Sequence, residues 1–215
     1  MSIDCKATVN IGPYARGGKT RGGAKAADHD MGCHEKYTPF GIVDEDHGQL
    51  YLRFGSSAKT SDFIVDGLQA WWEQLPGARR AACTLLQIKA DNGPESNGQR
   101  TQFLHRMVQF ADAIGKPIQL LYYPPYHSKY NPVERCWGIL EQHWNGALLL
   151  DAETMLQWAK SMTWKGLHPV VEMTHNVYAK GVKLTTKAMR AVEARLARNP
   201  ELPKWDILIK PARAV

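Results

Sequence analysis

One stretch constrains this chain more than any other, the segment Tyr122 to Trp144, which reads YYPPYHSKYNPVERCWGILEQHW. It ends a short apolar strand pattern, breaks at two prolines and starts a helix at Asn131-Pro132. Asn131 is a good N-cap, and Pro132 suits the first helical position, where a missing N–H costs nothing. Glu134 then has two interpretations. It closes a capping box, or it places one carboxylate of a metal site at a helix start.

Two further acids can accompany Glu134. Asp91 ends the apolar run 84–90 and comes just before Asn92-Gly93-Pro94, so it lies at the carboxyl end of a predicted strand. Open α/β sheets usually place their chemistry at that end. Asp4 lies inside an N-terminal strand pattern, 87 positions before Asp91, and Glu134 follows Asp91 by 43 positions. The order is therefore a strand acid, a strand-end acid and a helix-start acid.

These blocks resemble the DDE transposases of insertion sequences, which have a ribonuclease H-like catalytic core. The run PPYHSKYNPVERCWG is similar to the block around the third acid of mariner-type enzymes, ADNGPESNGQR to the second block, and SIDCKATVNIG to the first strand. The Rhodopirellula-type transposase family is the family that the chain resembles most. The resemblance also takes in residues 178–183 and 205–207, so it covers almost the whole chain.

The resemblance implies that Asp4, Asp91 and Glu134 are the catalytic acids and metal ligands. Three converging carboxylates repel one another, and hard divalent cations relieve that repulsion. We therefore expect two Mg²⁺ or Mn²⁺ ions, with Asp4 bridging both while Asp91 and Glu134 each hold one. The resemblance further implies that water first cuts a DNA strand at the element's end and that the freed 3′-hydroxyl then attacks target DNA.

The positive charge is concentrated at one end of the chain. The net charge is +6, and the last 40 residues alone hold nine Lys/Arg against three Asp/Glu, so the first 175 residues are neutral overall. This pattern fits a solvated basic helix, or a flank that contacts nucleic-acid phosphates. The resemblance favours the second interpretation, with DNA as the partner at element ends and target sites.

Several basic residues are candidates for DNA contact. Four lie in a glycine-rich stretch at 13–38 that reads as a loop, four near the C-terminus, and three beside the acidic blocks. The predicted DNA-binding residues are Arg16, Lys19, Arg21, Lys25, Arg100, Lys129, Arg135, Lys180, Lys183, Lys187 and Arg190. Further polar candidates for supporting or phosphate contacts are Asn92, Ser96, Asn97, His127 and Ser128.

The glycine-rich stretch also offers competing metal ligands. A zinc site is conceivable from Asp28, His29, Asp30, Cys33 and His34, but their spacing fits no standard zinc finger. Asp28 or Asp30 is also an alternative to Asp4 as the first catalytic acid. Asp4 is preferred because a strand holds a ligand more firmly than a loop does.

Strand and helix patterns alternate along the chain. Strand patterns occupy residues 1–12, 40–43, 49–54, 84–90, 118–122 and 170–173, with a closing segment at 205–209. Acids and a glycine at 44–48 predict a hairpin turn. Helical periodicity occupies residues 61–75, 99–114, 132–145, 152–163 and 185–198. The run at 84–90 is predominantly apolar, which is typical of a strand covered on both faces.

Together these patterns predict the α/β class, and the resemblance specifies a ribonuclease H-like mixed sheet with helices on both faces. We expect a single catalytic domain at 1–215 with a basic C-terminal extension and without the family's N-terminal helix-turn-helix region. No apolar run is long enough to span a membrane, no signal peptide is recognisable, and the four cysteines show no paired spacing. A cytoplasmic, nucleoid-associated bacterial protein follows as an expectation.

The sequence is compatible with three functions for this chain. The first is an active metal-dependent polynucleotidyl transferase that works as a homodimer or larger oligomer on DNA. The second is a transposase remnant that binds DNA but no longer cuts it. The third is a ribonuclease H-like nuclease that is not a transposase.

Overall fold

The computed structural model describes residues 1–29, 32–124 and 127–212. These residues form nine strands, paired both parallel and antiparallel, and six α-helices. The fold is mixed α/β and consistent with the ribonuclease H-like class, as the sequence predicted. The chain divides into two compact units. The first comprises Met1–Ile3, Ala58–Asn131 and Tyr178–Val215, and the second comprises Asp4–Ser57 and Pro132–Val177.

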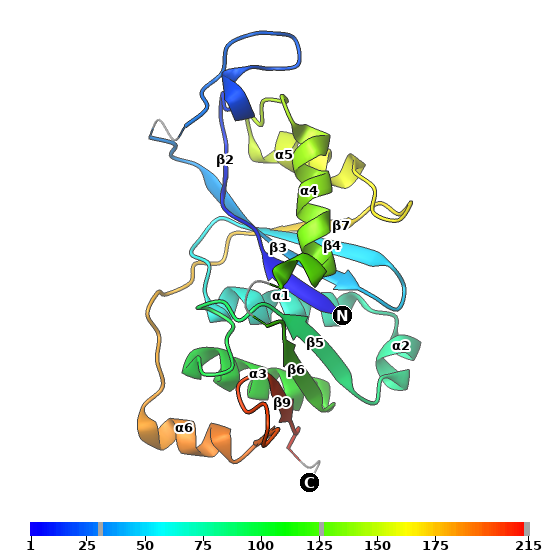
Figure 1. The fold of residues 1–215 in the computed structure, drawn as a ribbon, viewed down its shortest axis with the longest axis vertical. Helices are drawn as coiled ribbons and strands as arrows, with labels where there is room; N and C mark the ends of the chain where they lie inside the picture. The colour runs from blue at the N-terminus through cyan, green and yellow to red at the C-terminus, as the bar shows by residue number, and fades with distance from the viewer. Residues whose placement is uncertain (30–31, 125–126, 213–215) are drawn as a thin grey trace. The chain divides into compact units, whose positions relative to one another are not determined.

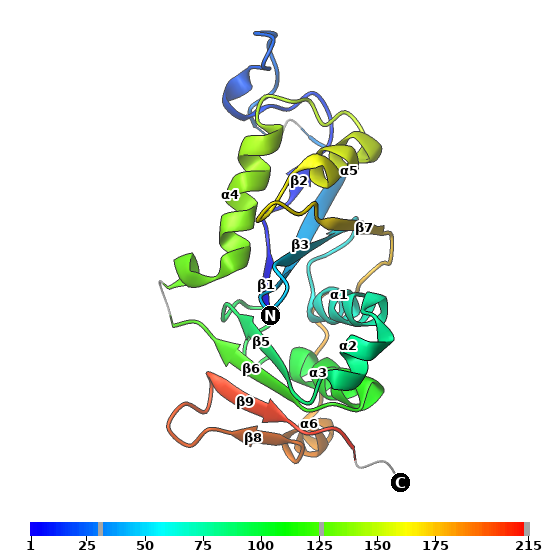
Figure 2. The same ribbon diagram turned by 90° about the vertical axis from the view of Figure 1, so that its right-hand side faces the viewer.

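The first unit is built on parallel strands extended by a C-terminal hairpin (Figures 1 and 2). Its strands are β1 (Ser2–Cys5, of which Ser2 and Ile3 belong here), β5 (Leu86–Ala90), β6 (Ile118–Tyr122), β8 (Leu196–Arg198) and β9 (Asp206–Ile209). β1 pairs parallel with β5, and β5 pairs parallel with β6. β9 then runs antiparallel to both β6 and β8. This register makes Ile3 and Ala90 partners.

Helices of the first unit bury apolar stripes that the sequence predicted. They are α1 (Ser61–Gln74), α2 (Gly77–Ala82), α3 (Thr101–Ile114) and α6 (Thr186–Glu193), with the 3-10 turn η2 (Ser128–Tyr130). Thr60 caps α1 by accepting a hydrogen bond from the Phe63 N–H. α3 ends at Gly115, whose left-handed φ of 64° suits glycine. Both helices direct fully buried phenylalanines into the core, among them Phe63 and Phe103.

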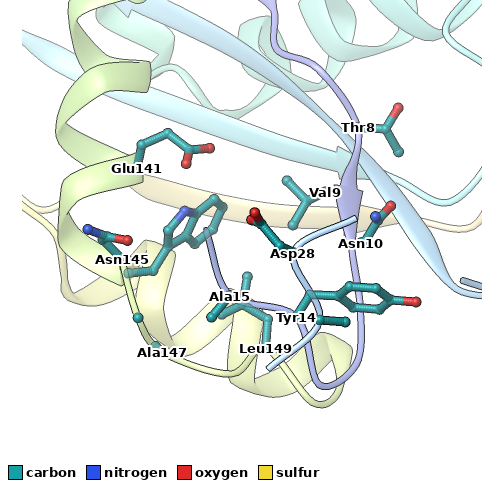
Figure 3. Close-up of a pocket in the computed structure, with 13 residues that line it drawn as sticks. Thr8, Val9, Asn10, Tyr14, Ala15, Asp28, Glu141, Asn145, Ala147 and Leu149 are labelled. Carbon is teal, nitrogen blue, oxygen red and sulfur yellow. The ribbon is translucent and has the colours of Figure 1, made fainter. Parts of the chain in front are cut away.

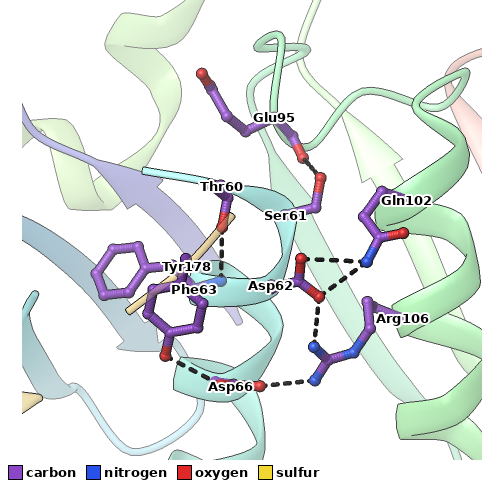
Figure 4. A network of polar contacts seen from close by, with 9 residues as sticks. All are labelled: Thr60, Ser61, Asp62, Phe63, Asp66, Glu95, Gln102, Arg106 and Tyr178. Carbon is purple, nitrogen blue, oxygen red and sulfur yellow. Dashed lines mark hydrogen bonds and ion pairs between the residues drawn. The ribbon is translucent and has the colours of Figure 1, made fainter. Parts of the chain in front are cut away.

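A polar network links α1 to α3 and to the segment that follows residue 177 (Figure 4). Arg106 donates from Nη1 to Asp62 Oδ1 and from Nη2 to Asp66 Oδ1, each at 2.6 Å. Gln102 Nε2 adds a second donor to Asp62 at 2.9 Å. The Tyr178 hydroxyl donates to Asp66 Oδ2 at 3.0 Å. The start of the basic C-terminal segment is therefore fixed to the helical layer of its own unit.

The second unit is an antiparallel hairpin with a parallel neighbour and two long helices. Its elements are β2 (Val9–Asn10), η1 (Arg16–Gly18), β3 (Lys36–Asp44), β4 (Gln49–Gly55), α4 (Pro132–Trp144), α5 (Ala152–Ser161) and β7 (Val170–Thr174). β3 pairs antiparallel with β2 and β4, and β7 runs parallel to β4. One apolar cluster joins the strands to α4 and α5, and it contains Leu52, Trp137, Leu140 and Met155.

Three details differ from the sequence-based expectations. β5 is not covered on both faces, because Gln87 is exposed between the buried Leu86 and Ile88. The C-terminal helix ends at Glu193, and the residues predicted to continue it form β8 instead. The short helix α2 was not predicted at all. Among the described residues, no helix has both the length and the apolar character needed to cross a membrane.

Candidate metal centre

Asp91 follows β5 directly and is half-buried in the first unit. Its Oδ1 atom is buried without a hydrogen-bond partner among the described residues. The same carboxyl is hydrogen-bonded to the Asn131 side chain. Burial raises the pKa of Asp91, and the bond with Asn131 offsets only part of that rise. A buried carboxylate oxygen that lacks a donor is costly unless a cation or a proton satisfies it.

Asn131 connects this acid to the neighbouring strand. Its side chain is completely buried, and Nδ2 donates to the backbone oxygen of Ile3 at 3.1 Å. Since Ile3 and Ala90 are register partners in parallel strands, Asn131 connects a backbone oxygen of β1 to the acid that follows β5. The sequence predicted this residue only as a helix cap. Its second function, holding Asp91 beside the strand end, had no signal in the local pattern.

Asp4 and Glu134 come together within the second unit. Asp4 lies in β1 after Ile3, and Glu134 lies in the first turn of α4. Each is half-buried, and one carboxylate oxygen of Asp4 lies within 4.8 Å of one of Glu134. Two carboxylates at this separation repel each other in the absence of a cation, and oxygen donors of this kind suit Mg²⁺ or Mn²⁺.

An indole group contacts one of these two acids. Trp137 Nε1 donates to Asp4 Oδ2 at 2.6 Å, and Trp137 as a whole is 5% exposed in the apolar cluster of the second unit. The spacing of α4 predicted Trp137 as a core residue, which is confirmed. The hydrogen bond to Asp4 was missed, because periodicity locates a face of a helix and not a ring N–H.

The residues weighed as zinc ligands do not come together in the described part of the chain. Asp28, His29, Cys33 and His34 form no group of ligand atoms close enough for a metal in the described part of the chain, and Asp30 lies outside it. Asp28 accepts a hydrogen bond from the Gly17 N–H at 2.7 Å and borders a cavity of about 280 Å³ (Figure 3). Glu141, on another wall of that cavity, is ion-paired with Lys6 at 2.7 Å.

The basic residues of the glycine-rich stretch have different surroundings. Lys19 and Lys25 are exposed, and Arg16 belongs to η1. Arg21 instead donates to the backbone oxygens of Asn145 and His143 at 2.7 and 2.5 Å, and its guanidinium lies 5.0 Å from the centre of the Trp158 ring. Arg21 therefore binds the carbonyl end of α4, where a cation is favourable.

The C-terminal basic residues divide in the same way. Lys180, Lys183, Lys187 and Arg190 are exposed. The backbone between them is fixed to α3, because Arg100 Nη2 donates to the Val182 oxygen at 3.3 Å. Arg195 and Arg198 are instead ion-paired, with Asp112 and Glu193 at 2.5 and 2.8 Å respectively.

The remaining candidates lie in the loops around the acids. Arg135 is exposed on α4, and Lys129 places its ammonium 5.2 Å from the centre of the Tyr130 ring. His127 is exposed and stacks on Tyr130. Ser128 belongs to η2. Of the polar candidates near Asp91, which are Asn92, Ser96 and Asn97, Ser96 contacts the backbone of the acid. Its Oγ lies 3.4 Å from the Asp91 backbone oxygen.

Comparison with known proteins adds an independent finding. A family model described as the Rhodopirellula transposase DDE domain matches residues 1–211. No curated protein and no solved structure is significantly similar to the chain. The family match spans the three acids, the supporting Asn131 and Trp137, and the basic C-terminal segment. The chain therefore belongs to the Rhodopirellula transposase DDE domain family.

Proposed function

We propose that this chain is the catalytic core of a DNA transposase and that it performs divalent-metal-dependent strand cleavage followed by strand transfer. The family supports a transposase of the polynucleotidyl transferase type, with DNA as its partner. The observation that carries the catalytic part is the buried Oδ1 of Asp91, which has no hydrogen-bond donor among the described residues. A folded protein tolerates such an oxygen where a cation binds it.

Asp91 joins Asp4 and Glu134 in one site under this proposal. Ile3 and Ala90 are register partners in the first unit, and each is followed directly by an acid. Glu134 has a carboxylate oxygen within 4.8 Å of one of Asp4. The sequence order of strand acid, strand-end acid and helix-start acid supports this proposal.

The donor set fits hard divalent cations. All three ligands are carboxylates, which suit Mg²⁺ or Mn²⁺ and not the softer metals. Asp4 would contact two ions, and Asp91 and Glu134 would hold one each. When bound, the ions supply charge stabilisation for the attacking and leaving oxygens of an in-line phosphoryl displacement.

The chain's own residues then orient the reacting groups. In cleavage, a water oxygen forms a bond to phosphorus, the bond to the 3′-oxygen breaks, and a free 3′-hydroxyl results. In transfer, that hydroxyl attacks a phosphate of target DNA and displaces its 3′-oxygen. Asn131 holds the carboxyl of Asp91 at the strand end during both steps. No side chain needs to form a covalent bond with DNA.

The basic residues of each unit supply its proposed phosphate contacts. In the first unit these are Lys180, Lys183, Lys187 and Arg190. Arg100 and Lys129, which lie in the sequence blocks around the acids, are added to them. In the second unit they are Lys19, Lys25 and Arg135, with Arg16 in η1, whereas Arg21 is engaged with α4. Phosphate contacts carry no sequence information, so we expect DNA binding in roughly the micromolar range with little sequence preference.

Three finer features remain part of the proposal: assembly as a homodimer or larger oligomer on DNA, a bacterial nucleoid-associated location, and a wider relationship to mariner-type enzymes. The block around Glu134 supports the last of these. The phosphate chemistry of DNA ends, which must be cut and joined in pairs, supports the first.

Strand cleavage by a Glu134→Gln variant tests the proposal. The wild type should nick element-end DNA with Mg²⁺ or Mn²⁺ and join the product to target DNA, while Glu134→Gln should do neither. Glu153→Gln, an exposed residue of α5, is the matched control and should cleave normally. Equal metal-dependent cleavage by Glu134→Gln and wild type would refute the assignment. DNA binding without cleavage would indicate an inactive remnant, and cleavage without joining a nuclease.

A further inference from the structure

Trp137 makes an unusual contact for a core residue. Its ring packs in the apolar cluster of the second unit, yet Nε1 donates to Asp4 Oδ2 at 2.6 Å. A short hydrogen bond to an ionised carboxylate is stronger than one between neutral groups. Trp137 as a whole is only 5% exposed, so water cannot readily replace this donor.

The chemistry of indole suits a carboxylate that also binds a cation. An indole N–H is a donor only, whereas a histidine in its place could itself bind the metal. A lysine or arginine would bring a positive charge that competes with the cation. The indole therefore binds Oδ2 of Asp4 and adds neither a ligand nor a charge.

A glycine in β3 provides the space for this ring. A Cβ atom on Gly41 would lie 2.7 Å from Trp137 Cη2 and 2.7 Å from Val133 Cγ1, both closer than real atoms approach. Only glycine at this position lets α4 lie so close to the strand. The close approach fixes the plane of the indole, and the plane fixes the direction of its N–H.

The same helix supplies both the donor and a ligand. Glu134 and Trp137 are three residues apart on α4, so they are neighbours on one helical face. Glu134 has a carboxylate oxygen within 4.8 Å of one of Asp4, and Trp137 is bonded to Asp4. Without the indole N–H, repulsion between the two carboxylates would favour rotation of the Asp4 side chain away from Glu134.

We propose that Trp137 is a positioning residue for the metal centre, which holds the Asp4 carboxylate in the rotamer that binds the divalent cation together with Glu134. This inference rests on the proposed function. It makes Trp137 part of the site through Asp4, although the indole itself touches neither metal nor DNA.

A pair of tryptophan variants tests this role. Trp137→Phe keeps an aromatic ring in the apolar cluster. It removes the N–H donor and part of the ring system. Trp164→Phe makes the same chemical change in the same apolar cluster, at an indole whose buried Nε1 has no hydrogen-bond partner among the described residues. Mn²⁺ binding to the DNA-free protein is measured by calorimetry, with the melting temperature as the record of folding.

Loss of a group that orients a metal ligand typically lowers metal affinity by about 10- to 100-fold. We expect that loss for Trp137→Phe and unchanged Mn²⁺ affinity for Trp164→Phe, while both variants lose thermal stability. Equal Mn²⁺ affinity in Trp137→Phe and Trp164→Phe would overturn the inference. If Glu134→Gln then still abolished Mn²⁺ binding, the proposed function would survive. Absence of Mn²⁺ binding by the wild type would overturn both.

The wild-type protein offers a second readout if Trp137→Phe does not fold. The chain has seven tryptophans, and each gives one indole ¹⁵N–H signal. Addition of Mg²⁺ should shift one indole signal strongly, and the same signal should move in Asp4→Asn. An indole spectrum that is insensitive to both Mg²⁺ and Asp4→Asn would also overturn the inference.

Discussion

Asp4 and Asp91 follow paired strand residues, yet their surroundings differ. Asp4 has a strong donor, the indole of Trp137 at 2.6 Å, in a packed apolar cluster. Asp91 has one oxygen that is buried without a donor, and its burial raises its pKa. The Asn131 side chain is hydrogen-bonded to this carboxyl.

This difference separates two tasks that a metal centre needs. At Asp4 the fold fixes the orientation of the carboxylate, because the Trp137 N–H, the packed indole ring and Gly41 restrict how the carboxylate can point. At Asp91 the folded protein carries the free-energy cost of a desolvated carboxylate, and a bound cation would reduce that cost. Changes at the two acids should therefore have opposite effects on the metal-free protein, and this contrast is open to test.

The largest effect is expected from Asp91→Asn. Loss of a metal ligand removes several kcal/mol of transition-state stabilisation, so cleavage should fall on the order of 10³-fold. The metal-free protein should nevertheless become more stable, because a buried charge is removed. Each kcal/mol gained raises the melting temperature by about 2–4 °C for a chain of this size. Thermal melts in a chelating buffer provide the measurement, and a lower melting temperature for Asp91→Asn would contradict the comparison.

Gly41→Ala should act in the opposite direction. The added methyl group overlaps the Trp137 ring and Val133, and overpacking of this kind costs about 1–3 kcal/mol. The indole must shift, so Mn²⁺ affinity should fall together with stability. Gly138→Ala is the control, because Gly138 is exposed on α4 with open space around it, and alanine there should stabilise the helix by about 0.5–1 kcal/mol. Normal stability of Gly41→Ala would show that α4 and β3 are less closely packed.

A pH series sharpens the contrast at Asp91. An acid whose folded-state pKa is raised contributes stability at low pH, and that contribution is lost as the pH rises through the folded-state pKa. In chelating buffer the melting temperature of the wild type should therefore fall relative to Asp91→Asn as the pH rises from about 3.5 towards neutral. Parallel curves for the two proteins would contradict the raised pKa.

The pKa of Asp112 is shifted in the opposite direction to that of Asp91. Desolvation raises its pKa, but hydrogen bonds from Arg195 and from the Ala212 N–H outweigh it and hold the pKa of Asp112 below its usual value. Its contribution to stability is present above the unfolded-state pKa and is lost as the pH falls through the folded-state pKa. Asp112→Asn should therefore lower the melting temperature at neutral pH, modestly because the side chain is more than one-third exposed.

The smallest expected effect is on the salt dependence of DNA binding. Replacing Lys183, Lys187 and Arg190 by glutamine should reduce the salt dependence of DNA binding without changing which sequence is preferred. A salt titration with element-end and scrambled DNA measures both quantities. A wild-type preference above about a hundredfold, equivalent to 2.7 kcal/mol, would show that this chain reads bases itself.

Much of the fold could be predicted because periodicity and caps agree. The stripes of α1, α3 and α4 and the turn at Asp44 follow local rules, and Asp44 Oδ1 does accept from the His47 N–H. The C-terminal helix was overextended because Ala194-Arg195-Leu196-Ala197-Arg198 contains good helix formers. Pairing with β9 and the ion pairs of Arg195 and Arg198 override that preference.

The site was less predictable than the fold. Motif order identified Asp4, Asp91 and Glu134 as candidates, but it could not show that Asn131 bridges a strand oxygen and Asp91. Charge patterning selected Arg21 for DNA contact, and it could not show that Arg21 also donates to carbonyls at the end of α4. The contacts of Arg21, and that of Asn131 with Ile3, join residues more than a hundred positions apart, so no local pattern contains them.

The proposed metal centre is tested most simply by a crystal structure of the protein grown with Mn²⁺, examined for anomalous scattering. We expect Mn²⁺ bound by carboxylate oxygens of Asp4, Asp91 and Glu134 together, at the roughly 2.0–2.2 Å typical of oxygen ligands, with the Trp137 N–H still on Asp4. Mn²⁺ bound elsewhere, or a well-ordered crystal in which these three carboxylates hold no ion, would contradict it.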